Sequence, residues 1–367
     1  MTHSSLPLTS PSIADLLPDF DADIDHASLN GIDPDVNLIT FSQSKYFNRL
    51  LTHDPHVGLS VLSHNIRVLD LFLDSLATIT NTLATEKNTT YIIYSHVERI
   101  YKELEQLGIK DNDPLDVHQV SQFDQYHYHG TESVAEATKK LGIETPPKTI
   151  LSSSSHRVLD IGAGLGGPSR YLAELTGCKV TAIEMQEDLH LVATDLTRRC
   201  GLSQKVTHIC GDILKYDIGE AGKYDFIVSW LVFLHIPEKK RLFEKCFGYL
   251  KASGQMYVED FWKKSEFLPE EKEILSERVY MRDPPPSDLD YIAQIKEAGF
   301  DRVEFDDVTD SWSDFCKQRA ESYRKLKERH VRVHGKDVYE EQDAFFDAMD
   351  FLFHQGHLGG CKLIATK

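Results

Sequence analysis

The stretch VLDIGAGLGGPSRYLAELTG, residues 158–177, constrains the fold more than any other part of the sequence. An apolar run ends in an acid and is followed by closely spaced glycines, and then by residues typical of a helix. Glycines at such a turn let a ligand approach the backbone, and the start of the helix favours an anionic group. The stretch therefore predicts a strand, a ligand-binding turn and a helix in succession.

The same alternation of strand and helix continues toward the end of the chain. Strands are predicted at 157–162, 179–185, 206–212, 224–230, 254–260, 302–308 and 361–367. Helices are predicted at 132–142, 168–177, 187–201, 238–250, about 311–333 and 337–354. Strands that alternate with helices are typical of an α/β fold with a parallel, doubly wound sheet.

The first 117 residues carry weaker signals. Residues 1–40 are rich in serine, proline and aspartate and are expected to form a disordered tail. Residues 41–117 carry apolar residues at helical spacing and are expected to form a helical N-terminal region. This region is interpreted as a cap packed on the main domain, with a homodimer formed through its helices as the alternative.

Charge and cysteine content argue against several classes of function. With 58 acidic and 40 basic residues the formal charge is −18, which repels phosphate backbones, so no nucleic-acid partner is expected. No apolar run reaches the roughly 20 residues of a membrane span, and no leader is recognised, so a cytoplasmic protein is expected. The six cysteines form no CxxC pair, and neither a disulfide framework nor a metal site is predicted.

The glycine turn has the spacing of a cofactor-binding motif. Gly162, Gly164 and Gly166 satisfy GxGxxG, and Glu184 lies twenty residues past Gly164 at the end of the second predicted strand. There its carboxylate can accept hydrogen bonds from ribose hydroxyls. This pattern alone fits either a nicotinamide dinucleotide or S-adenosylmethionine (SAM).

Further acids favour SAM over a dinucleotide. Asp160 precedes the first glycine by two residues, where its carboxylate can face an ammonium group rather than a pyrophosphate. Asp212 ends the third strand and suits an adenine amino group, with Ile213 beside the ring. Met185 and Ser229, at the ends of the second and fourth strands, complete the candidate cofactor-binding set.

This ordered set resembles the class I SAM-dependent methyltransferases. Four segments are more specifically similar to the phosphoethanolamine and glycine/sarcosine/dimethylglycine N-methyltransferases: 123–142, 258–261, 297–312 and 359–367. The resemblance covers roughly residues 118–367 and implies a Rossmann-like, seven-stranded methyltransferase sheet. It also implies a lid at 118–150, substrate-side segments at 268–350, SAM as cofactor with S-adenosylhomocysteine as product, and a small-molecule methyl acceptor.

The resemblance also proposes residues for the chemistry. Tyr126 matches a lid tyrosine that would orient the amine, face the sulfonium or accept a proton. Tyr128 is a further candidate for binding substrate, although for Tyr128, His127 and His129 an ordinary capping segment is the favoured interpretation.

Three candidates follow the fourth and fifth strands. Asp260 matches a substrate-facing aspartate that would pair with an ammonium group, and a surface acid at the end of a strand is its alternative. His235 is a candidate base because histidine titrates near neutrality, and a polar loop residue is its alternative. Trp230 would stack on substrate or adenine, or else belong to the core.

The segment 276–288 departs from the family pattern. Arg278 and Tyr280 match residues that would bind phosphate in the phosphoethanolamine enzymes, and a solvated arginine on a helix is the alternative for Arg278. An earlier tyrosine of that set is replaced by Ile274, and three consecutive prolines look like an insertion. A carboxylate, which needs fewer donors than a phosphate, therefore suits this segment better.

Together these features predict N-methylation of a small zwitterionic amine, of the sarcosine/dimethylglycine, betaine-forming type. The alternative keeps SAM and changes the acceptor to sulfur, oxygen or another amine, such as a thioether or phosphoethanolamine. A nicotinamide-dependent oxidoreductase and a catalytically silent interaction protein are the less favoured interpretations.

Overall fold

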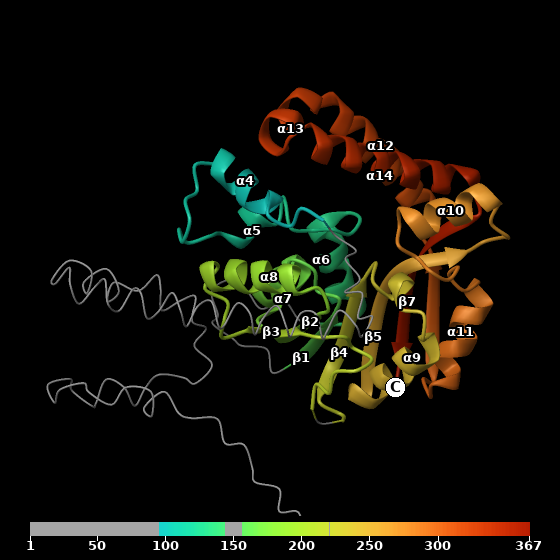
Figure 1. Cartoon of the computed structure of the whole chain (residues 1–367). Helices are drawn as coiled ribbons and strands as arrows, with labels where there is room; N and C mark the ends of the chain where they lie inside the picture. Colours follow the sequence, from blue (N-terminus) through green and yellow to red (C-terminus); the bar gives the residue numbers. More distant parts are fainter. Residues whose placement is uncertain (1–94, 144–155, 220) are drawn as a thin grey trace, which may run out of the picture. The chain divides into compact units, whose positions relative to one another are not determined.

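The computed structural model describes residues 95–143, 156–219 and 221–367 (Figure 1). The predictions of a tail at 1–40, of a helical region over most of 41–117, and of a dimer through its helices lie outside these residues. The described helices and strands all belong to one structural unit, Thr90–Lys367.

Seven strands form one sheet in the order β3-β2-β1-β4-β5-β7-β6. They are β1 (Arg157–Ile161), β2 (Lys179–Glu184), β3 (Val206–Cys210), β4 (Tyr224–Trp230), β5 (Leu250–Lys263), β6 (Arg302–Asp307) and β7 (Leu358–Thr366). The predicted seven-stranded, Rossmann-like sheet is thus confirmed.

One strand departs from the predicted parallel arrangement. Neighbours from β3 through β5 are parallel, whereas β7 inserts between β5 and β6 and runs antiparallel to both. All but the last residue of β7 are buried. A strand covered on both faces reads as one apolar run in either direction, so its pattern does not reveal its orientation.

The helices alternate with the strands as predicted, with two differences. They are α4 (Arg99–Gln106), α5 (Val117–Val120), α6 (Gly130–Lys140), α7 (Gly167–Thr176), α8 (Glu187–Arg199), α9 (Lys239–Tyr249), α10 (Pro269–Glu277), α11 (Asp288–Glu297), α12 (Thr309–Lys325), α13 (Lys327–His334) and α14 (Lys336–Gln355), with a short 3₁₀ helix, η3 (Phe233–His235). The helix predicted at 311–333 is two helices, because Leu326 leaves the helical conformation (φ −102°, ψ 18°). Helices α5, α10 and α11 were not predicted. Among the described residues, no helix combines the length and apolarity needed to cross a membrane.

Both faces of the sheet are covered, as a doubly wound fold requires. On one face, Leu242 and Phe243 of α9 and Tyr291 of α11 pack with the strands. On the other face, Val134 of α6 and Leu172 of α7 do the same. The carboxyl ends of the parallel strands are therefore left to the loops, where ligands bind in folds of this kind.

Two further apolar clusters bring distant segments to those loops. Ile100 of α4 and Val120 of α5 belong to a cluster with Leu165 of the glycine turn and Leu196 of α8. Tyr128 belongs to a cluster with residues of α10, α12 and α14. The segment from α4 to α6 thus joins the glycine turn to the C-terminal helices (Figure 1).

Candidate functional site

The three glycines of the turn after β1 have different surroundings. All have positive φ, at 72° for Gly162, 53° for Gly164 and 73° for Gly166, a region that favours glycine. A Cβ atom on Gly162 would lie 2.3 Å from Val232, and one on Gly166 would lie 2.8 Å from a guanidinium nitrogen of Arg170. A Cβ on Gly164 would meet nothing within 4 Å. Gly164 is therefore where a ligand can approach the backbone.

Asp160 lies one residue before the end of β1 as a buried carboxylate, with 1% of its surface exposed. Its Oδ2 accepts a hydrogen bond from the Ser169 hydroxyl at 2.5 Å. Burial raises the pKa of Asp160 to about 7, and the neighbouring charge of Glu184 adds to the rise. A cationic group beside this carboxylate would favour its ionised form, so the site fits a ligand that carries an ammonium group.

Glu184 ends β2 and is attached to the same turn. Its Oε2 accepts from the backbone N–H of Gly164 at 2.8 Å, and its Oε1 accepts from the N–H of Gln186 at 2.8 Å. Burial raises its pKa, and these hydrogen bonds oppose the rise. Each oxygen keeps a further lone pair, so the carboxylate can also accept bonds from ligand hydroxyls. The adjacent Met185 is 43% exposed.

Asp212 and Ile213 follow β3, the next strand in the sheet. Asp212 Oδ1 accepts from the N–H of Leu214 at 2.9 Å, and Oδ2 lies 3.5 Å from Lys215 Nζ. Ile213 is buried, and Ser229 of β4 donates its hydroxyl to the Ile161 carbonyl at 2.8 Å. The hydrogen bond of Ser229 ties β4 to β1.

The glycine turn and the predicted lid are connected by two residues, Arg170 and Asp124, that the sequence analysis did not identify. Arg170 of α7 is fully buried and donates to Asp124 Oδ2 at 2.7 Å and to the Leu165 carbonyl at 2.6 Å. A Cβ on Gly167 would lie 2.4 Å from the Asp124 carbonyl oxygen. Gly167 therefore makes room for the lid segment. The available signal was an arginine on the buried face of an otherwise apolar helix.

The two lid tyrosines lie in different clusters. Tyr126 packs with the apolar cluster of α4 and α8, and burial raises its pKa to about 12. Tyr128 is 2% exposed, its ring is 4.8 Å from that of Trp312, and the Arg319 guanidinium lies 5.0 Å from its centroid. Both phenols are therefore protonated at neutral pH, and their predicted roles toward substrate stay predictions.

His235 is brought to the segment after α10. Its Nδ1 lies 3.3 Å from the Tyr280 carbonyl oxygen, and burial lowers its pKa to about 4. The imidazole is thus neutral at neutral pH, which is the form that can accept a proton. Arg278, at the end of α10, is exposed, and Tyr280 is 37% exposed.

Asp260 and Trp230 project to opposite faces of the sheet. Asp260 is fully buried toward α11, where Tyr291 donates its hydroxyl to Oδ2 and the Leu234 N–H donates to Oδ1 at 3.2 Å. Burial raises the pKa of Asp260 to about 6. Trp230 donates Nε1–H to the hydroxyl of Ser133 on α6 at 2.9 Å. Both have protein partners here, so their predicted contacts with substrate stay predictions.

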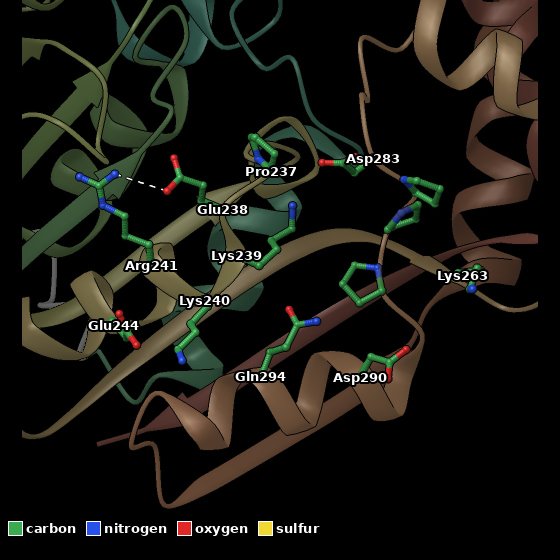
Figure 2. A pocket seen from close by; sticks show the side chains of 13 residues that line it. Pro237, Glu238, Lys239, Lys240, Arg241, Glu244, Lys263, Asp283, Asp290 and Gln294 are labelled. Atoms are coloured by element: carbon green, nitrogen blue, oxygen red, sulfur yellow. Dashed lines mark hydrogen bonds and ion pairs between the residues drawn. The ribbon is translucent and has the colours of Figure 1, made fainter.

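A pocket of about 880 Å³ opens beside the start of α9 and the three prolines (Figure 2). Its lining carries four basic and four acidic side chains: Lys239, Lys240, Arg241, Lys263, Glu238, Glu244, Asp283 and Asp290. Lys239 donates its ammonium to the carbonyls of Phe233 at 2.6 Å and Ile236 at 2.5 Å, on the two sides of His235. The pocket therefore adjoins the His235 segment and has no excess charge of either sign.

Known proteins match this arrangement. Residues 158–254 match a family model described as a methyltransferase domain. Phosphoethanolamine N-methyltransferase 1 of Arabidopsis thaliana is 27% identical over 213 residues, which cover 58% of this chain and 40% of that protein. Sarcosine/dimethylglycine N-methyltransferase of Halorhodospira halochloris is 24% identical over 204 residues, which cover 55% of this chain and 71% of that protein.

A solved structure extends the likeness to the fold. Phosphoethanolamine N-methyltransferase 2 of Haemonchus contortus, in complex with phosphomonomethylethanolamine and S-adenosylhomocysteine, aligns with a TM-score of 0.60 and 17% identity over 73% of this chain and 56% of that chain. The chain spans about two fifths of the length of the Arabidopsis relative. The predicted resemblance is confirmed: residues 158–254 match a methyltransferase domain, and the fold is shared with a phosphoethanolamine N-methyltransferase.

Proposed function

We propose that this methyltransferase-domain protein transfers a methyl group from SAM to the nitrogen of a small zwitterionic amine of the sarcosine/dimethylglycine, betaine-forming type. The observation that carries the proposal is the buried carboxylate of Asp160 beside the open Gly164, whose N–H is bound by Glu184. Asp160 would hold the ammonium group of SAM and Glu184 its ribose hydroxyls. Asp212 and Ile213 would hold the adenine.

Bound SAM would supply an electrophilic methyl group, and the protein would have to present the amine to it. Amine nitrogen and methyl carbon must be in line and about 3–3.5 Å apart. The amine must also lose its proton, because only the free lone pair attacks. Neutral His235 is the candidate proton acceptor, and because its pKa is about 4 it would pass the proton on to water. Tyr126, with a pKa of about 12, is suited to orienting the amine as a hydrogen-bonding phenol.

The charge of the substrate-side segments supports a zwitterionic acceptor. The pocket beside the His235 segment has equal numbers of acidic and basic side chains, which suits a molecule with one charge of each sign. A phosphate monoester carries up to two negative charges and calls for a cluster of cations. Arg278 would hold the carboxylate of the acceptor.

Phosphoethanolamine is the second candidate acceptor. Arg278 and Tyr280 both match phosphate-binding positions of that family, and the Arabidopsis relative is named for this reaction. The two candidates share the cofactor site and differ in the anion that the segment after α10 would bind.

The test is methyl transfer from labelled SAM by the purified chain, with the products identified by mass. The acceptors are glycine, sarcosine, dimethylglycine, phosphoethanolamine and a small thioether. Labelled dimethylglycine from sarcosine, or betaine from dimethylglycine, supports the proposal. Product from phosphoethanolamine alone would favour the second candidate, and product from the thioether alone would overturn N-methylation. Asp160→Asn should abolish transfer, and Asp347→Asn, an exposed change on α14, should leave it intact.

A further inference from the structure

Glu103, His330 and His334 lie together where α4 meets α13 (Figure 1). Each offers one ligand atom, and the three atoms lie within 4.8 Å of one another. A tetrahedral zinc ion with ligands at about 2.0–2.2 Å separates its ligand atoms by about 3.3–3.6 Å, so small side-chain movements would complete the site. We propose that these three residues bind a divalent transition-metal ion of the zinc class.

The spacing of the two histidines supports this proposal. His330 and His334 are four residues apart on one helix, which places both imidazoles on the same face. Their ring centroids are 6.2 Å apart, with an angle of 19° between the planes. Two histidines at this spacing are a common way for a helix to bind zinc. Tyr323 stacks on His330 with centroids 4.2 Å apart and so limits the rotation of that ring.

The donor set selects the class of metal. Two imidazole nitrogens and one carboxylate suit zinc and similar transition metals, whereas magnesium and calcium prefer oxygen ligands throughout. His334 and Glu103 are buried, with 5% and 8% of their surfaces exposed. Three protein ligands would leave a fourth position of a tetrahedral ion for water.

Basic side chains surround the carboxylate of the proposed site. Burial lowers the pKa values of His330 and His334. Burial alone would raise the pKa of Glu103, but hydrogen bonds from Arg329 and His334 lower it overall. Glu103 is therefore a carboxylate, with Oε1 at 2.7 Å from His334 Nε2 and at 3.0 Å from Arg329.

Two buried nitrogen atoms provide an independent sign of a missing partner. The Nδ1 atoms of His330 and His334 are both buried and have no hydrogen-bond partner in the described structure. Buried polar atoms in native proteins are nearly always satisfied. An ion bound by either atom would satisfy it.

A metal at this place would connect two distant parts of the sequence. Glu103 lies in α4, shortly before the lid segment that contains Asp124 and Tyr126. The histidines lie in α13, which follows the helix that carries Trp312 and Arg319. The ion would fix α4, and with it the start of the predicted lid, to α13. It would take no part in methyl transfer.

The test is calorimetric titration of the chelator-treated, full-length chain with Zn²⁺. We expect one ion per chain with a dissociation constant of about 1 μM or below. His330→Ala and Glu103→Gln should each weaken binding at least 100-fold, whereas His354→Ala, an exposed change on α14, should leave it unchanged. Mg²⁺ should not compete. Co²⁺ should give tetrahedral visible absorption that is lost in His334→Ala.

Other outcomes overturn the proposal. Absence of Zn²⁺ binding by a folded wild-type chain would mean that Glu103, His334 and Arg329 form only a hydrogen-bonded ion pair. Binding that survives both His330→Ala and Glu103→Gln would place the ion elsewhere. Competition by Mg²⁺ at similar concentration would contradict the assigned class of metal. Melting curves recorded without metal identify any variant that fails to fold. If a histidine variant fails to fold, the effect of Glu103→Gln on Zn²⁺ binding tests the proposal, because this change nearly preserves side-chain size.

Discussion

Asp124→Ala tests whether a buried ion pair holds the lid segment to the glycine turn. The Arg170 and Asp124 side chains are 0% and 2% exposed, and the guanidinium also donates to the carbonyl of Leu165 in the turn. Removing one partner of a buried pair costs about 3–5 kcal/mol, because the other charge stays buried without compensation. For a domain of this size each kcal/mol lowers the melting temperature by about 2–4 °C, so a fall of roughly 6–20 °C is expected.

The assay is urea unfolding of the wild type and two variants. The matched control is Asp347→Ala, which removes a carboxylate 2.6 Å from Arg324 in a pair whose side chains are 43% and 64% exposed. An exposed pair contributes about 0.2–1 kcal/mol. The reasoning is refuted if Asp124→Ala costs no more than Asp347→Ala, since burial would then not be what makes the lid contact strong.

Three further predictions concern the glycine turn and the α11 face of the sheet. Gly164→Ala and Gly201→Ala should each lower the free energy of unfolding in urea by about 1–2 kcal/mol, because both glycines have positive φ and open space around them. Only Gly164→Ala should weaken SAM binding in calorimetry. Burial raises the pKa of Asp160 to about 7, so the folded chain retains a proton there that the unfolded chain has released. Without SAM, the wild type should therefore lose stability relative to Asp160→Asn as the pH rises from about 4 to above 7. The loss in the free energy of unfolding should be about 4 kcal/mol. A constant difference between the two proteins across that range would contradict the raised pKa of Asp160. Tyr291→Phe removes the hydroxyl donated to Asp260 and should cost about 1–3 kcal/mol in urea unfolding, while a neutral effect would mean that the carboxyl finds another partner.

The sequence predicted the fold best where a buried strand is followed directly by a turn and a helix with their own local patterns. The run from Val158 through the glycines predicted β1, the turn and α7, because each has its own period or backbone requirement. The direction of β7 was not predictable, because a strand buried on both faces has no directional pattern. The break at Leu326 was also missed, since apolar spacing continues across it.

The positions of candidate residues in the fold were predictable only where those residues are close in sequence to the strands. Asp160 and Glu184 follow from strand ends and the spacing of the glycines. The pair of Arg170 with Asp124 spans 46 residues, and that of His334 with Glu103 spans 231, so no local pattern connects either pair. The four-residue spacing of His330 and His334 was visible in the sequence, but their carboxylate partner was not.

The central claim is that the acid at the end of β1 and the open glycine after it hold SAM. Calorimetric titration of SAM into the wild-type chain and into Asp160→Asn tests it most directly. We expect one SAM per wild-type chain, an affinity for SAM at least tenfold weaker in Asp160→Asn, and no binding of NAD. Equal affinities in the two proteins, or binding of NAD in place of SAM, would contradict it.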